Sequence, residues 1–207
     1  MKYKVEYSHS IKDFEDVWNI EKEYLEPSTI SSVEQVLNWD AKNTDIHIFV
    51  RDIIADKIVG EITILPLSKE QFNKFMNNEL EDTQINNDSL LKYNENEKYY
   101  LLFSAIAIDK NYREDRLVLG LLLKGFYEKL CFFELKNISF FNMCAEGQTK
   151  DGQKFIESFL NLKCKNNTDE GYKLYCFDGE SDFDIWLKKF PRYIENYIQK
   201  YNLNIDS

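Results

Sequence analysis

The sequence predicts an α/β fold in which strands and amphipathic helices share one core. Segments with strand-like alternation and segments with helical spacing of apolar residues follow one another along the chain. Residues 47–51 and 57–66 have the pattern of an antiparallel hairpin, with a short turn at Ala55 and Asp56. Residues 99–109 (YYLLFSAIAID) are apolar on both faces, which is typical of a central strand covered on both sides.

The length and composition are those of a folded domain. The chain has 207 residues, and at that size folding buries roughly 70% of the surface of the unfolded chain. Hydrophobic residues make up 43% and aromatic residues 15%, which is more than a disordered chain carries. The core therefore needs neither disulfides nor a metal.

The first half of the chain predicts a strand, two helices, the hairpin and an insertion. Residues 2–7 alternate as a strand, and Ser10 with Asp13 forms a capping box before apolar residues at helical spacing. Pro27 ends this helix, and a second helical pattern follows it. Residues 67–98 are polar and acid-rich after a short helical stretch, so we expect an insertion there and not a second domain.

The second half continues the alternation of strands and helices. We expect a helix over residues 116–130, a strand over 137–144, a helix over 151–160, a strand over 171–178 and a last helix over 181–201. Pro191 is expected to interrupt that last helix. We therefore divide the chain into a domain over residues 1–180, with its insertion at 67–98, and a helical tail over 181–207. The tail carries so much apolar surface that we expect it to pack on the domain or on a partner subunit.

The charge balance excludes several classes of partner. Lys and Arg total 26 against 36 Asp and Glu, so the net charge of −10 repels nucleic acid and favours small cationic partners.

The longest apolar run, residues 117–123, falls short of the ~18 residues that a membrane-spanning helix needs. The first residues lack the apolar region of a signal peptide, and we expect a cytoplasmic protein.

The cysteines and histidines form no recognisable metal or redox motif. Cys131, Cys144, Cys164 and Cys176 lie far apart in the sequence, without a CxxC pair, and His9 and His47 are the only histidines. We expect no metal, and we expect the cysteines to be reduced and buried.

Three segments resemble the GNAT family of acyl-CoA N-acetyltransferases. Residues 104–130 (SAIAIDKNYREDRLVLGLLLKGFYEKL) are similar to the family's central strand, its R/Q-x-x-G-x-G/A turn and the following helix, with Arg113 in the R/Q position. KIVGEITIL resembles its third strand, with Gly60 in place, and AEGQTKDGQ resembles its A-x-x-x-T-x-x-G variant. The resemblance covers about residues 1–178. It implies a mixed, mostly antiparallel central sheet flanked by helices, with the insertion before the central strand and the C-terminal helix as additions.

The resemblance also implies a site for acetyl-CoA. Its pantetheine arm would pair with the backbone of Ile106, Ala107 and Ile108. Its pyrophosphate would lie in a cradle made by Arg113, Glu114, Asp115, Arg116, Leu117 and Val118. Arg116 and Val118 replace the two glycines of the motif, so side chains are expected where the family has bare backbone.

Two interpretations of this turn stay open. In one, Glu114 and Asp115 only complement the helix dipole, and no anion binds. In the other, Arg113 and Arg116 replace the amide contacts with charge-assisted hydrogen bonds to phosphate.

Three residues are candidates for catalysis, by the same resemblance. Glu61 on the third strand could serve as a base, although the alternation of Ile62 and Ile64 favours a solvated carboxylate there. Ser104 could orient the acceptor, or it could simply bond to the backbone inside the core. Glu146 follows the fifth strand, where the acceptor pocket of the family narrows, and it could equally be a surface charge.

These residues support two hypotheses of function. The first is an N-acetyltransferase that moves the acetyl group of acetyl-CoA to a primary amine of a small molecule or peptide, in a monomer or homodimer. The second is a GNAT-fold binding or regulatory module without catalysis, which the missing glycines favour. The acidic insertion predicts a cationic acceptor, such as a polyamine, an amino sugar or a lysine-rich peptide.

Overall fold

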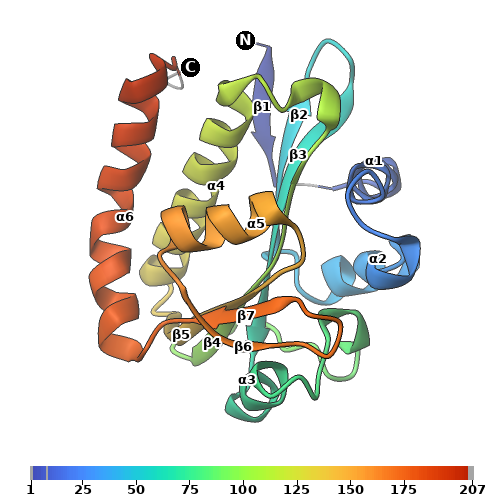
Figure 1. Cartoon of the computed structure of the whole chain (residues 1–207). Coiled ribbons are helices and arrows are strands. Elements are labelled where there is room, and N and C mark those ends of the chain that lie inside the picture. Colours follow the sequence, from blue (N-terminus) through green and yellow to red (C-terminus); the bar gives the residue numbers. More distant parts are fainter. Residues whose placement is uncertain (1, 8, 205–207) are drawn as a thin grey trace.

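Seven strands form one mixed sheet that runs through the molecule (Figure 1). The structure, a computed structural model, describes residues 2–7 and 9–204. The first residue of the predicted domain (1–180) and the last three residues of the predicted tail (181–207) therefore lie outside the described residues. The strands are β1 (Tyr3–Glu6), β2 (His47–Asp52), β3 (Lys57–Leu67), β4 (Lys98–Ile108), β5 (Ser139–Gly147), β6 (Lys163–Asn167) and β7 (Lys173–Cys176).

The strand order is β1-β2-β3-β4-β5-β7-β6. β4 and β5 are parallel, and each of the other neighbouring pairs is antiparallel. The predicted fold class, a mixed and mostly antiparallel sheet flanked by helices, is thereby confirmed.

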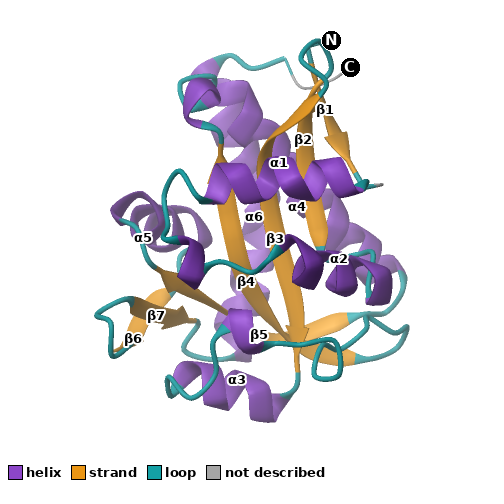
Figure 2. Cartoon of the chain, turned by 90° about the vertical axis from the view of Figure 1, so that its right-hand side faces the viewer, coloured by secondary structure: helices purple, strands orange, loops and turns teal. Residues whose placement is uncertain are grey.

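Helices cover both faces of the sheet. They are α1 (Ile11–Glu21), α2 (Val33–Lys42), α3 (Lys69–Met76), α4 (Arg116–Leu135), α5 (Lys150–Phe155, continued by a π-helical turn over Ile156–Leu160) and α6 (Glu180–Tyr201). Figures 1 and 2 show α1 and α2 on one face of the sheet and α4 on the other, with α6 outside α4. Both faces of β3 and β4 are therefore shielded from water near their middle.

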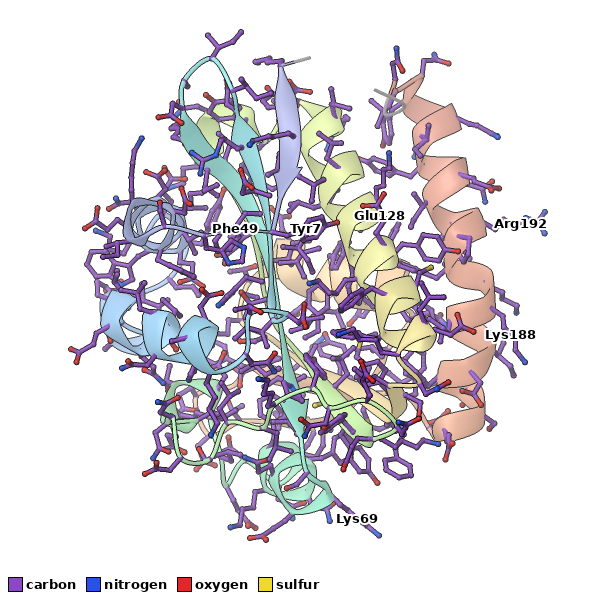
Figure 3. The ribbon with its side chains drawn as sticks, turned by 180° about the vertical axis from the view of Figure 1, so that it is seen from behind. Tyr7, Phe49, Lys69, Glu128, Lys188 and Arg192 are labelled. Atoms are coloured by element: carbon purple, nitrogen blue, oxygen red, sulfur yellow. The ribbon has the colours of Figure 1, made fainter. Side chains whose placement is uncertain are left out.

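Close approach of α4 to β3 depends on Gly60. A Cβ atom at this position would lie 3.1 Å from Val118 and 3.1 Å from Leu122, both of which are fully buried. On the opposite face, Phe14 and Val17 of α1 pack against Phe49 of β2, which Figure 3 labels. The two helices thus fix the middle of the sheet from both sides.

The helix α6 covers the outer side of α4. Its apolar side chains Phe183, Trp186, Phe190 and Ile194 are buried, and Phe190 packs edge-on against Phe126 of α4. Lys188 and Arg192 project from its other face into solvent (Figure 3). The tail is therefore amphipathic, with its apolar side turned to the domain.

One prediction about secondary structure was wrong, and one strand was missed. Helix α6 continues through Pro191, because buried Phe190 and Ile194 hold the chain on both sides of it against the domain. The hairpin partner of β7, strand β6, was not predicted at all. Its sequence KCKNN is exposed along its whole length, so it has none of the apolar alternation by which a strand is recognised.

The predicted insertion is tied to the domain on two sides. Its side chains Ile85, Leu90 and Tyr93 are buried in the main core. The Trp39 indole of α2 donates a hydrogen bond to the Ile85 carbonyl (2.7 Å), and the Asn166 amide of β6 donates one to the Met76 carbonyl (3.3 Å). The segment therefore bridges α2 and the β6–β7 hairpin.

Candidate functional site

The strands β4 and β5 separate halfway along the sheet. Their parallel pairing runs from Lys98 and Ser139 to Phe103 and Ala145, and ends there. Beyond this point β4 stays with β3, while β5 continues with β7. A wedge-shaped opening therefore begins at Ser104 on one strand and Glu146 on the other.

The open edge of β4 exposes backbone groups on alternate residues. The Asp109 amide donates to the Val59 carbonyl of β3 (3.0 Å), and successive residues of a strand point their backbone groups to opposite sides. The backbone groups of Ile106 and Ile108 consequently face the opening. Those of Ala107 face β3, so this one of the three predicted pantetheine contacts is not at the open edge.

Tyr24, just after α1, lies across this edge. Its hydroxyl donates a hydrogen bond of 2.5 Å to the Ile108 carbonyl. The Arg113 guanidinium lies 5.1 Å from the centre of the same ring, a cation–π contact. One aromatic side chain thus connects the open strand edge with the turn that follows it.

The opening leads into a cavity of about 1030 Å³. Its lining comes from both ends of the sheet opening: α1, α2, β3, β4, the end of β5, the start of α4, α5 and the end of α6, together with Phe75 of α3 and Asp82 of the insertion. At the end next to the turn after β4 basic side chains predominate, namely Arg113, Arg116, Lys150, Lys154 and Lys200, beside the carboxylates of Glu114 and Asp151. At the other end it is acidic, with Glu21, Glu61, Asp82 and Glu146. The cavity therefore presents opposite charges to the two ends of a ligand.

The arginines at the basic end already have anionic or aromatic partners. Arg113 forms an ion pair with Asp151 of α5, which joins the two sides of the opening. Arg116 lies 3.9 Å from Glu114 and 5.6 Å from the ring centre of Tyr201 on α6. Exposed pairs of this kind stabilise a fold by ~1 kcal/mol or less, so an incoming phosphate can exchange with them.

The N-terminus of α4 is capped by the protein itself. The Asp115 carboxylate accepts a hydrogen bond from the Leu117 amide (3.2 Å) and another from the Tyr3 hydroxyl (2.6 Å). The Asp115 carbonyl accepts from the Val118 amide (3.1 Å). Two amides of the predicted phosphate cradle are thus occupied, and any anion bound here depends more on arginine side chains than on the backbone.

The side chain at position 118 does not reach the predicted anion site. Val118 points into the core beneath Gly60 and is fully buried. Leu117 packs partly buried against the same core, whereas Arg116 and Glu114 line the cavity.

Glu61 is buried, and the expectation of a solvated carboxylate was wrong. The alternation does turn it away from Ile62, but α1 covers that second face, and the side chain is only 1% exposed. Its Oε2 accepts a hydrogen bond from the Thr63 hydroxyl at 3.4 Å, while its Oε1 has no hydrogen-bond partner in the described structure. Behind it, His47 Nδ1 lies 2.9 Å from the Thr63 hydroxyl. Burial, and then the charge of Glu21, raise the pKa of Glu61 well above its usual value.

The other carboxyl groups at this end also have raised pKa values. Burial, and then the charge of Asp82, raise the pKa of Glu21 to about 8. Burial raises the pKa of Glu146 to about 7, against a hydrogen bond from the Gln148 amide (2.7 Å) that lowers it. Burial also raises the pKa of Asp82, which accepts a hydrogen bond of 2.7 Å from Ser104. None of the ion pairs found within residues 2–7 and 9–204 involves the carboxyl group of Glu21, Glu61, Asp82 or Glu146.

The structure brings the three predicted catalytic residues to one place. Glu61, Ser104 and Glu146 all line the acidic end of the cavity, and Ser104 and Glu146 are the first residues after the strands part. Thr149 caps α5 by accepting a hydrogen bond from the Gly152 amide (3.0 Å).

Sequence reasoning overlooked Glu21 and Tyr24 as site residues. Glu21 follows Phe14 and Val17 at helical spacing, so a carboxylate stands in an otherwise apolar stripe, and that was the available signal. Asp82 begins a 3-10 helix of three residues (Asp82–Gln84) in the insertion, which is too short for a periodic pattern to indicate which side chains turn inward.

Comparison with solved structures identifies the architecture. The loading GNATL domain of CurA from Lyngbya majuscula superimposes with a TM-score of 0.59, over 85% of this chain and 97% of that chain, at 13% sequence identity. The chain has the GNAT fold. The same fold relates it to Ard1 from Thermoplasma volcanium (TM-score 0.53, 13% identity, 85% of this chain and 97% of that one). A third similar structure is the NatC complex bound to Gag peptide and CoA (TM-score 0.56, 8% identity, 86% and 98%).

The likeness rests on the GNAT fold and not on sequence. No protein-family model matches the sequence, and no curated protein matches it. The described residues contain no group of three or more His, Cys, Asp or Glu side chains placed to hold a metal ion. None of the helices in the described part is long and apolar enough to cross a membrane.

Proposed function

We propose that this protein is an N-acetyltransferase that uses acetyl-CoA and a primary amine. The observation that carries the proposal is the opening between β4 and β5, which leads into a cavity that is basic at one end and acidic at the other. CoA ends in phosphates and an amine acceptor is a cation, so the two substrates of such a reaction match the two ends of the cavity. The GNAT fold of the chain supports the same reaction class.

The residues of the opening fit acetyl-CoA. The exposed backbone groups of Ile106 and Ile108 would pair with the amides of the pantetheine arm, and Arg113 and Arg116 would bind the pyrophosphate. From Ile108 back to Ser104 the strand covers ~13 Å, at 3.3 Å for each residue. An extended arm along this edge would therefore bring the thioester to the point where the strands part.

In this proposal Glu146 accepts the proton of the amine. Acetyl-CoA supplies an acetyl thioester, whose carbonyl carbon forms the new C–N bond while the C–S bond breaks and CoA leaves as a thiolate. The Glu146 carboxylate would first take a proton from the ammonium group and so free its lone pair. The second N–H proton, released after attack, neutralises the thiolate. A base with a pKa of about 7 is well matched to this task near neutral pH.

The proposal is tested by binding and by transfer. At a hundred times its dissociation constant, acetyl-CoA adds ~2.7 kcal/mol to the free energy of unfolding, so the melting temperature should rise by several degrees. Release of the CoA thiol should require an amine, and Glu146→Gln should slow it by about 10²–10⁴-fold without loss of acetyl-CoA binding. The absence of a thermal shift at millimolar acetyl-CoA would overturn the proposal.

A module without catalysis is the second candidate. The observation in its favour is that the protein itself occupies parts of the site, through the Asp115 cap and the Tyr24 bond to Ile108. Such a module would show no thiol release with any amine, whether or not acetyl-CoA bound. Single-turnover transfer to any small amine would exclude it.

A further inference from the structure

Four carboxyl groups converge on the acidic end of the cavity from four separate segments. Glu21 lies at the end of α1, Glu61 on β3, Asp82 in the insertion and Glu146 on β5. They are close enough to influence one another, because the charge of Asp82 raises the pKa of both Glu21 and Glu146. Burial and mutual repulsion therefore disfavour the charged forms of these carboxyl groups, and a bound cation would favour them.

Glu61 provides independent evidence that a ligand belongs there. Its side chain is 1% exposed and lines the cavity, and its Oε1 atom is buried without a hydrogen-bond donor. An unsatisfied buried acceptor costs ~1–3 kcal/mol, and more when it is charged. A donor supplied by a ligand in the cavity would remove this cost.

A single reacting amine cannot satisfy these groups. The nitrogen that attacks the thioester must be neutral, so a monoamine has no positive charge left at the moment of reaction. A second amine on the same molecule does not react and keeps its proton. It can then pair with Glu61 and its neighbours while the first amine is held beside Glu146.

The shape of this end favours a small molecule. The insertion closes the gap between α2 and the β6–β7 hairpin, where Trp39 binds the Ile85 carbonyl and Asn166 binds the Met76 carbonyl. Apolar side chains such as Ile30 and Phe75 also line the cavity, and they suit a methylene chain.

On this basis we propose that the acceptor is an aliphatic diamine or polyamine, one amine of which is acetylated while another is held as an ammonium group by Glu61, Glu21 and Asp82. The inference rests on the proposed function and names its acceptor class. It distinguishes this acceptor from a lysine-bearing peptide, which brings one ammonium group on a bulky chain.

The test compares 1,4-diaminobutane and spermidine with n-butylamine, which has the same four-carbon chain as diaminobutane but only one amine. Calorimetric titration without acetyl-CoA measures binding, and release of the CoA thiol measures transfer. The diamine and spermidine should bind at least about ten-fold more tightly than butylamine, because each charge-assisted contact of the second amine is worth about ten-fold in affinity.

Variants locate the effect within the cavity. Glu61→Gln and Asp82→Asn should each weaken diamine binding by about ten-fold and reduce the preference of transfer for diaminobutane over butylamine by a similar factor. The matched control is Glu79→Gln, on the exposed surface of the same insertion and outside the cavity lining, and it should change neither. Melting curves show whether each variant is folded. If one of the two cavity variants does not fold, the other still tests the proposal.

The outcomes separate this inference from the proposed function. Equal affinity and equal transfer for butylamine and diaminobutane would overturn the diamine proposal and leave the N-acetyltransferase standing. Preferred transfer to a lysine-bearing peptide would do the same. Tight diamine binding with no thiol release would support the acceptor site and count against the enzyme.

Discussion

The stability of the Glu146→Gln variant relative to the wild type should be higher at alkaline pH than at mildly acidic pH. Burial raises the pKa of Glu146 from 4.5 to about 7 in the folded state. Between these two values the folded protein holds a proton on Glu146 that the unfolded chain has released. The contribution of Glu146 to the free energy of unfolding is therefore lost as pH rises towards 7 and above. Glutamine does not titrate and removes this dependence.

The magnitude follows from the size of the shift. At pH 5.5 the folded-state pKa lies about 1.5 units above the pH, and at ~1.4 kcal/mol for each unit the protonated group stabilises the fold by about 2 kcal/mol. At pH 8.5 this contribution is gone. Because the side chain is partly solvated, 2 kcal/mol is an upper limit. For a domain of this size it corresponds to a shift in melting temperature of roughly 4–8 °C.

Urea unfolding of the two proteins at pH 5.5 and pH 8.5 measures the effect. Other groups titrate over the same range, so the relevant quantity is the stability of Glu146→Gln minus that of the wild type, compared between the two pH values. We expect this difference to be larger at pH 8.5. A difference that does not change with pH would refute the raised pKa of Glu146 and, with it, the role of this residue as a base near neutral pH.

Three further predictions concern the basic end, the sheet and the tail. Arg113→Ala and Arg116→Ala should each weaken acetyl-CoA binding about ten-fold in calorimetric titrations, while the melting temperatures stay nearly constant. Unchanged affinities would mean that the phosphates bind elsewhere. Gly60→Val should lower the free energy of unfolding by about 1–3 kcal/mol, measured by urea, since the added carbons meet α4 at 3.1 Å; a neutral result would show that α4 moves freely. Trp186→Ala should cost about 3–5 kcal/mol, and a loss below 1 kcal/mol would mean that α6 contributes little to the fold.

The central part of the fold could be predicted because its residues have one dominant environment. Residues 99–109 are apolar on both faces since helices cover both sides of β4, and Gly60 is required where α4 approaches β3. β6 could not be predicted in this way, because an exposed edge strand is held by its backbone hydrogen bonds and its side chains show no alternation of apolar and polar residues.

The sequence indicated candidate residues for the site but not their electrostatics. The resemblance named Glu61, Ser104 and Glu146 as candidates for catalysis, and all three line the same cavity. Alternation indicates which face of a strand a side chain occupies, but not whether a helix covers that face. For this reason the burial of Glu61 and its coupling to Glu21 emerged only from the three-dimensional arrangement.

The ion pair between Arg113 and Asp151 makes ligand entry an exchange of counterions. A phosphate that reaches Arg113 displaces a carboxylate that the protein already provides across the opening. The salt-dependent gain from the new contact is therefore partly offset by the loss of the old one, and the affinity for a phosphate-bearing ligand should vary less with ionic strength than the number of basic residues suggests. Once Asp151 is released, its ion pair no longer joins α5 to the turn after β4.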